Sequence, residues 1–293
     1  MTRLAVLADI HGNLPALQAV IDDMAQFKVD RVVVAGDSIN WGPCSRGVME
    51  ALWERRWPLI RGNNEFYLLD YDTERAPAHW SRFTMPPYLH EQLGDGWANA
   101  IAALPDTVQL RFRDAPPIRV CHGIPGDHWT AITPQSSTAQ IRRWLRDISE
   151  RTLICAHSHI ALERHVDGRS IFNPGSVGVP LDGEHSASYM ILDGRENGWE
   201  LAAHRRVPID VAPLLAEFER QNFIERCGVT AHLVLEEFRT ARLQLAAYLI
   251  WKQQHHAGRD DSFELLREFR DLVDASPYLP PAYRGLTSAL YRD

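Results

Sequence analysis

The sequence has few cysteines, and none of them is spaced like a redox or metal-binding pair. Cys44, Cys121, Cys155 and Cys227 lie far apart and form no C-x-x-C motif. Disulfide-rich secreted domains need a framework of cysteines, and structural zinc sites need closely spaced pairs. The sequence therefore predicts reduced thiols and argues against a disulfide scaffold, which favours a cytoplasmic protein.

Long apolar runs and an excess of positive charge are also missing. No stretch approaches the roughly 20 apolar residues of a membrane span, and the first predicted strand begins almost at Met1, which leaves no room for a signal peptide. The formal net charge is −7, so a protein that binds mainly the nucleic-acid backbone is not expected. An acidic protein can still bind phosphate where bound divalent metals reverse the local charge.

The chain is long enough for one large domain, or for one domain with an appendage, at 293 residues. Histidine is frequent: 13 residues are roughly twice the share expected of an average chain. Five histidines lie in or beside the motifs described below. The others are interpreted as surface or packing residues: His79, His90, His165, His185, His204, His232, His255 and His256.

The first motif closes an apolar run near the amino end. Residues 4–8 predict a buried strand that is followed by Asp9 and His11. Gly12 then predicts a tight turn, and Asn13 predicts the cap of a helix. Because ligands bind beyond the carboxyl ends of strands in an open α/β sheet, Asp9 and His11 are placed to bind a divalent metal such as Mn, Fe or Zn. A single D-x-H motif remains weak evidence.

Two further predicted strands end in polar side chains. The β-branched run 31–35 leads to a Gly-Asp pair at Asp37, and the short run 58–61 leads to a Gly-Asn pair at Asn63. The order strand, helix, strand puts Asp9 and Asp37 at one edge of a parallel sheet. A Gly-Asp pair is also common as a simple turn with a helix cap, so Asp37 taken alone keeps two interpretations. Asn63 offers a neutral amide oxygen as a metal ligand.

Histidines follow two later strands. The run 118–121 ends at His122, and the run 152–155 ends at Ala156-His157-Ser158-His159. An Asn-Pro-Gly-Ser sequence follows at 173–176. Together and in this order, the five motifs with candidate ligands resemble those of the calcineurin-like metallophosphoesterases, the binuclear metal phosphoesterase superfamily, and the Asn-Pro-Gly-Ser sequence resembles its bacterial branch. The resemblance covers about residues 2–205, with Ala156 in place of the usual glycine.

The resemblance implies an α/β fold, a four-layer αββα sandwich, for a phosphoesterase domain over residues 1–207. From Pro208 the pattern becomes helical, so residues 208–293 are predicted to form an all-helical C-terminal extension. An apolar stripe predicts one long helix there, formed by Val234, Phe238, Ala241, Leu245 and Tyr248. Such a stripe serves either to pack the extension on the phosphoesterase domain or to join two copies of the chain in a homo-oligomer.

The resemblance also implies a set of metal ligands. Asp37 would bridge two ions. Asp9, His11 and His159 would complete the first site, and Asn63, His122 and His157 would complete the second. These seven side chains carry a charge of −2 against +4 from two divalent ions, so the site would stay electropositive and attract phosphate.

The implied chemistry is hydrolysis of phosphate esters by a water or hydroxide that two divalent metals activate. Two ions about 3.5–4 Å apart clamp the phosphoryl oxygens and acidify a shared water. The ligands accept Mn, Fe, Zn, Ni or Co, and we expect Mn. The expected substrate is a small phosphorylated molecule, with a nucleotide among the candidates.

One residue departs from the phosphatase branch of the superfamily. There, the residue after the metal-binding asparagine is a histidine that assists the leaving oxygen, whereas this sequence has Asn64. An amide donates a hydrogen bond but cannot give up a proton, so poor leaving groups should be cleaved slowly. We therefore expect phosphodiesters to be preferred over monoesters. His128 is a second candidate for the catalytic acid, against the simpler interpretation as a loop histidine.

Three other functions were weighed. A serine/threonine protein phosphatase and a dinucleoside polyphosphate hydrolase both share this motif set. A non-enzymatic, protein-binding scaffold is known on the same fold, because fold does not determine function. Loss of metal ligands would favour the scaffold, but all seven ligand positions are present in this sequence.

Overall fold

The computed structural model describes residues 1–77, 80, 84–272 and 274–292, and its core is two β-sheets packed face to face. The first sheet has the order β2-β1-β8-β9 and contains β1 (Thr2–Leu7), β2 (Arg31–Val34), β8 (Ser186–Arg195) and β9 (Gly198–Pro208). The second has the order β10-β6-β7-β5-β4-β3. Its strands are β3 (Thr107–Leu110), β4 (Ile118–Cys121), β5 (Thr152–Ile154), β6 (Ala161–Val166), β7 (Arg169–Pro174) and β10 (Tyr291–Arg292).

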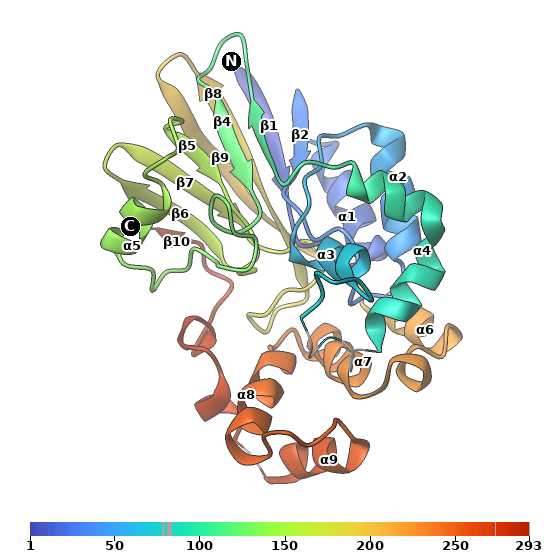
Figure 1. Cartoon of the computed structure of the whole chain (residues 1–293). Coiled ribbons are helices and arrows are strands. Elements are labelled where there is room, and N and C mark those ends of the chain that lie inside the picture. The colour runs from blue at the N-terminus through green and yellow to red at the C-terminus, as the bar shows by residue number, and fades with distance from the viewer. Residues whose placement is uncertain (78–79, 81–83, 273, 293) are drawn as a thin grey trace.

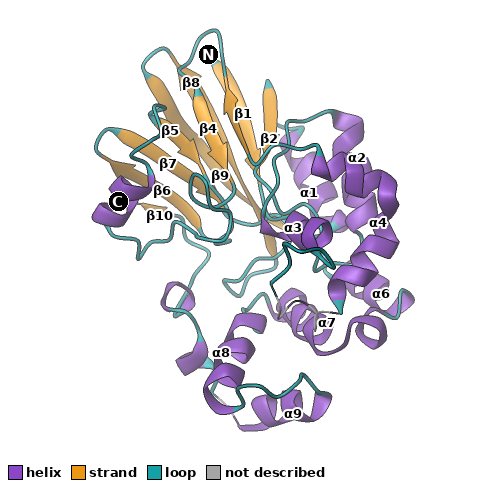
Figure 2. Cartoon of the chain, in the orientation of Figure 1, coloured by secondary structure: helices purple, strands orange, loops and turns teal. Residues whose placement is uncertain are grey.

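Helices cover the outer faces of both sheets, as Figures 1 and 2 show. Helices α1 (Leu14–Met24) and α2 (Ser45–Arg55) pack on the first sheet, and α5 (Thr138–Trp144) packs on the second. Between the sheets lies a dry core that includes Val6, Val120 and Phe172. The predicted four-layer αββα sandwich is therefore confirmed. Alternating side chains explain it, because each strand sends apolar residues to both the inner and the outer core.

The elements after β9 form the extension, and it shares a hydrophobic core with the sandwich. Its helices are α6 (Ala212–Arg220), α7 (Phe223–Thr240), α8 (Leu245–His255) and α9 (Phe263–Leu272), with short 3-10 turns at Ser276–Tyr278 and Pro281–Tyr283. Phe218 and Phe223 of the extension pack against Tyr88 of α4 (Met85–Ala102) and Leu181 of the sandwich. The extension is not helical throughout, because β10 returns to the second sheet and pairs in parallel with β6.

Two local predictions were wrong. The run 58–61 forms only an isolated bridge, between Val34 and Leu59, before α3 (Asn63–Asp70) begins. The stripe from Val234 to Tyr248 does not lie on one helix, because α7 ends at Thr240 and α8 begins at Leu245. Spacing alone could not reveal this break. It is made by the buried Glu237, whose Oε1 accepts the backbone amides of Gln244 and Leu245, each at 2.8 Å, and so caps the start of α8.

One further local prediction is confirmed, and one hairpin was not predicted. Asn13 caps α1, since its side chain accepts the amide of Ala16. The hairpin β8–β9 had no signal in our motifs, although it supplies half of the first sheet. No helix within the described residues is both long and apolar enough to cross a membrane. The cytoplasmic location expected from the sequence stays a prediction.

Candidate metal centre

The polar residues of the motifs meet where strands of both sheets end. Asp9 and His11 follow β1, and Asp37 follows β2, both in the first sheet. His122 follows β4 directly, and His157 and His159 follow β5, in the second sheet. The parallel pairs β1–β2 and β4–β5 point their carboxyl ends to the same side, so these side chains converge on one edge of the sandwich. We call the loops that carry them the rim.

These six residues form two groups of three. Within each group, the candidate ligand atoms all lie within 4.8 Å of one another. The first group is Asp9, His11 and His159, and the second is Asp37, His122 and His157. In the first, the Nε2 atoms of His11 and His159 are 3.1 Å apart. In the second, His122 Nε2 lies 3.0 Å from Asn63 Oδ1. Ligands about 2.1 Å from one ion are separated by about 3 Å, so both spacings suit a coordination sphere.

Asp37 lies between the two groups. Its Oδ2 atom is 3.6 Å from His11 Nε2 and 3.3 Å from His122 Nε2. The side chain is 2% exposed, so the carboxylate faces the cluster and not solvent. This position is the one a bridging carboxylate needs.

Three of the four imidazoles are held by backbone carbonyls. His122 Nδ1 lies 2.8 Å from the Ala35 carbonyl oxygen, His159 Nδ1 lies 2.8 Å from that of Val179, and His157 Nε2 lies 3.0 Å from that of Trp129. A carbonyl only accepts hydrogen bonds, so each of these nitrogens carries the proton. In the neutral rings of His157 and His159 the other nitrogen keeps its lone pair, as a metal-binding histidine must, and at His122 an ion would take the place of the second proton.

The rim backbone adopts a conformation that most residues avoid. Five proposed ligands have a positive φ: Asp9 (54°), His11 (48°), Asp37 (53°), His157 (68°) and His159 (57°). Each such residue costs about 1–3 kcal/mol, and such residues gather at functional sites. Gly36 allows a close approach here, because a Cβ on it would lie 2.7 Å from His122 Nδ1. Ala156, by contrast, fits its place, with its methyl group buried between the sheets.

Burial controls the charge of the imidazoles. It lowers the pKa of His11 to about 4 and that of His157 to about 4. It likewise lowers the pKa of His159 to about 3, so these three rings are neutral at pH 7. At His122, burial opposes the charge, but the carboxylate of Asp37 outweighs it and raises the pKa to about 9. For Asp37, burial is outweighed in turn by His122, and its pKa falls well below the usual value.

The first group fits a cation. Burial raises the pKa of Asp9 well above its usual value, which means that the anionic form lacks compensation there. Its Oδ1 atom is buried and has no hydrogen-bond partner among the described residues. A divalent ion would supply the missing charge and the missing partner at once.

Glu65 is a rim residue that our sequence reasoning missed. It is buried and accepts four backbone amides: those of Gly62 (2.6 Å), Asp37 (3.0 Å), Ser38 (2.8 Å) and Ile39 (3.4 Å). Glu65 thus ties the loop that carries Asp37 to the loop that carries Asn63. A signal existed, because a glutamate three residues after the start of a helix often binds back to the backbone there.

The two candidates for the catalytic acid are placed differently. Asn64 is buried in the rim, where its Nδ2 donates to Asp37 Oδ2 at 2.7 Å and its Oδ1 accepts from Asn40 Nδ2 at 2.9 Å. His128 lies outside both ligand groups, with its ring stacked on Phe66 at a centroid distance of 4.0 Å. Burial lowers the pKa of His128.

The other histidines that the structure describes do not join this cluster. Among the described residues, the two ligand groups contain no histidine besides His11, His122, His157 and His159. His79 lies outside the described residues, so its interpretation as a surface or packing residue is not examined by the structure.

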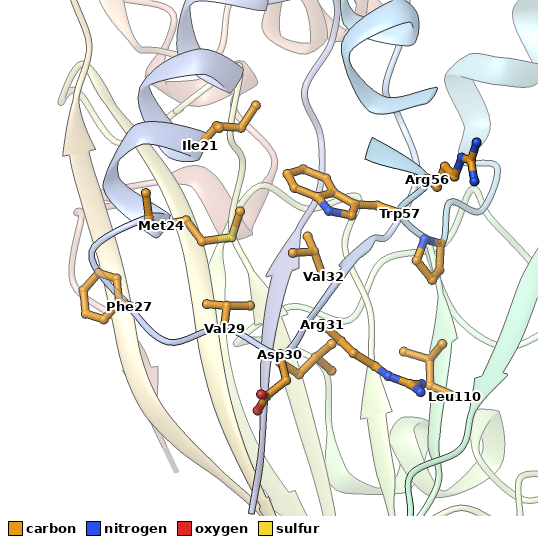
Figure 3. Close-up of a pocket in the computed structure, with 13 residues that line it drawn as sticks. Ile21, Met24, Phe27, Val29, Asp30, Arg31, Val32, Arg56, Trp57 and Leu110 are labelled. Atoms are coloured by element: carbon orange, nitrogen blue, oxygen red, sulfur yellow. The ribbon is translucent and has the colours of Figure 1, made fainter. Parts of the chain in front are cut away.

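A separate cavity lies far from this centre. It has a volume of about 540 Å³ and lies beside Leu4 and Arg31, at the amino ends of β1 and β2. Figure 3 shows Ile21 and Met24 of α1 on one side of it and Arg56 and Trp57 on the other. Asp9 lies five residues further along from Leu4, about 16 Å away in extended chain, so this cavity is no part of the metal centre.

Comparison with known proteins gives the same result as the motifs. The model of the calcineurin-like phosphoesterase superfamily domain matches residues 2–197. An uncharacterized protein of Methanocaldococcus jannaschii is 23% identical over 249 residues, which cover 78% of this chain and 96% of that protein.

Two solved structures are similar to this one in fold. A metallophosphoesterase from Sphaerobacter thermophilus is 21% identical, with a TM-score of 0.65, covering 82% of this chain and 99% of its own. A hypothetical protein from Pyrococcus horikoshii is also 21% identical, with a TM-score of 0.67, covering 80% of this chain and 98% of its own. Both matches cover more of the chain than the family model does, so they reach into the extension.

Proposed function

The chain belongs to the calcineurin-like phosphoesterase superfamily, and on that basis we propose that it is a metal-dependent phosphoesterase that prefers phosphodiesters. Asp9, His11 and His159 would hold one divalent ion, and Asn63, His122 and His157 the other. Asp37 would contact both. We favour Mn²⁺, because oxygen and imidazole ligands suit it.

One observation carries this proposal: backbone carbonyls fix three imidazoles that belong to two neighbouring groups of candidate metal ligands. A packing histidine has no need of such orientation, whereas a ligand does. When bound, two divalent ions would neutralise the phosphate and lower the pKa of a water so that it attacks at neutral pH. A protein-binding scaffold would have no use for the strained, largely buried ligand set, so we place that function last.

The preference for diesters rests on Asn64. Both ends of its amide are engaged, one by Asp37 and one by Asn40, so Asn64 orients the bridging carboxylate. It supplies no proton to a leaving oxygen. Alkoxide leaving groups, such as that of phosphoserine, would then leave slowly, which disfavours a protein phosphatase. When a phosphoanhydride is cleaved, the leaving group is a phosphate, which departs without being protonated by the enzyme. A dinucleoside polyphosphate hydrolase is therefore the second candidate.

Metal dependence is the direct test. Hydrolysis of bis(4-nitrophenyl) phosphate should stop in excess chelator and return with Mn²⁺. Asp37→Asn should weaken both metal sites at once, and His11→Ala should chiefly weaken the first, as measured by metal content per chain. Hydrolysis that survives excess chelator, or an Asp37→Asn variant that keeps two metals and full turnover, would refute the proposal.

A further inference from the structure

A small pocket adjoins the metal centre, and the C-terminal extension supplies part of its wall. The pocket has a volume of about 90 Å³. Asn63 and Asn64 of the rim line it, as do Leu245 and Leu249 of α8. In Figure 1, α7 and α8 lie below the loops that follow the strand ends. Asn63 lines the pocket and also lies 3.0 Å from His122 of the second ligand group, so a molecule bound at the metals would have the pocket as its neighbour.

The wall of the pocket is uncharged and largely apolar. Trp41, Tyr67 and Met85 also line the pocket. None of its lining residues within the described part of the chain carries a charge at pH 7. Trp41 is held in place by stacking on His11, with ring centroids 4.4 Å apart and planes 14° from parallel. The aromatic wall is therefore built directly onto the proposed metal ligands.

Leu249 shows that the pocket reaches solvent. This residue is 41% exposed, although it is a large apolar side chain on a helix that buries its neighbour Tyr248. Tyr67 also contacts Trp129, which is 43% exposed and meets Tyr67 edge to face with centroids 5.5 Å apart. Two of the exposed large apolar side chains thus flank the metal centre, as expected where an apolar ligand is to be covered.

We propose that this pocket binds one organic group of the phosphate ester, and that the group is small, uncharged and apolar, such as an aryl ring or a short alkyl chain. The inference rests on the proposed function and adds a substrate class to it. Its volume of about 90 Å³ is smaller than the roughly 150 Å³ of an apolar cavity that binds benzene, so it holds a short alkyl chain, or a ring that stays partly in solvent beside the exposed Leu249. The lining residues that the structure describes include no positively charged side chain that could pair with a second phosphate. The extension would then select the substrate, while the rim performs the reaction.

Binding of phosphonates tests this proposal without relying on turnover. The protein with Mn²⁺ is titrated by calorimetry with phenylphosphonate and with methylphosphonate, which carry the same charged group but differ in the ring. Phenylphosphonate should bind about tenfold more tightly, because the ring leaves water. In Leu249→Asp and Leu249→Ala this advantage should fall to about one- to threefold. Gln253→Asp, an exposed residue of α8 outside the pocket, adds the same charge as Leu249→Asp and should keep the advantage.

The outcomes separate the two proposals. If both phosphonates bind only with Mn²⁺ but with equal affinity, the metal centre stands and the pocket proposal falls. The pocket proposal also falls if the Leu249 variants keep the full advantage of the ring. If neither phosphonate binds in the presence of Mn²⁺, the proposed function itself is overturned, and the pocket proposal with it.

Discussion

Two buried glutamates organise backbone in two different regions, Glu65 in the rim and Glu237 in the extension. Burial raises the pKa of each to about 7. Glu65 engages both of its oxygens with four amides of the rim loops. Glu237 uses Oε1 alone, for two amides at the start of α8, and its Oε2 has no hydrogen-bond partner among the described residues.

The two regions differ in the interactions that keep their backbone in place. The rim keeps several residues with positive φ beside buried charges, so its geometry depends on a dense set of hydrogen bonds. The extension is held by apolar packing, both to the sandwich and within itself around Tyr248, Trp251 and Phe269. We therefore expect damage to the rim to reduce the chemistry, and damage to the extension to reduce folding and selectivity.

Removal of the extension should have the largest effect. A chain that ends at residue 207 would expose Met85, Tyr88, Ile160 and Val179, which the extension now covers. Exposed apolar surface of this kind promotes association, so we expect insoluble protein or an altered oligomer on size-exclusion chromatography. A chain that ends at residue 286 loses only β10 and the last residues, and should remain folded. A monomeric and fully active 1–207 fragment would show that the two regions are independent.

Replacing Asn64 tests whether this rim residue determines how well the leaving group is protonated. Asn64→His introduces a proton donor and should raise the hydrolysis of esters with poor leaving groups, by up to about 10²–10⁴-fold. The dependence of rate on leaving-group pKa, measured with a series of aryl esters, should become flatter while metal content stays constant. Asn64→Ala also removes the bond to Asp37 but adds no donor, so it should slow all esters alike. If His128 already supplies the proton, Asn64→His will leave the slope unchanged and His128→Ala will steepen it.

Replacing Glu65 should have a smaller but broader effect. Glu65→Gln puts an amide donor opposite backbone donors, so at least one pair of rim hydrogen bonds is lost. We expect a loss of about 2–4 kcal/mol in the free energy of unfolding and about 10–100-fold in Mn²⁺ affinity. Denaturant titration and metal titration measure the two. Glu50→Gln on α2, which removes only an exposed pair with Arg46, should change neither by much. Unchanged metal affinity in Glu65→Gln would contradict the role given to the rim.

Replacing Glu237 should have the smallest effect, a change in how the free energy of unfolding depends on pH. Its pKa of about 7 in the folded chain lies above the ordinary glutamate value of 4.5, because burial disfavours the charge. The folded state therefore holds a proton that the unfolded state has lost, and stability falls as pH rises from about 4.5 to 7. The slope contributed is at most about 1.4 kcal/mol per pH unit. Tyr283 faces this carboxyl from the neighbouring turn and stays protonated throughout, since burial raises its pKa above the usual range.

Denaturant titrations at several pH values measure this slope. Glu237→Gln should remove it, whereas Glu219→Gln, an exposed residue of α6, should leave it unchanged. Equal slopes in the protein and in Glu237→Gln would show that Glu237 does not hold an extra proton in the folded chain over this pH range.

The resemblance of the motifs to a known superfamily implied the sandwich, and strand patterns that end in polar side chains predicted that Asp9 and Asp37 lie at one edge of a sheet. The sequence could not predict Glu65 as an organiser, since its bonds join loops that are about 28 residues apart. It placed Leu245 on a continuous helical stripe, where the structure has a break and a pocket wall. Such features depend on tertiary contacts, which override local spacing. The metal ligands themselves stay a prediction until metal binding is measured.

The core shared by the sandwich and the extension has a consequence for synthesis. Tyr88 is translated about 125 residues before Leu214, the first extension residue that packs into the same core. At roughly 5–20 residues per second, the ribosome takes on the order of ten seconds to cover that interval. During this time the nascent chain carries an uncovered apolar face, and the rim becomes complete only once His159 has been translated. That interval is when aggregation, or capture by a chaperone, competes most strongly with folding of this protein.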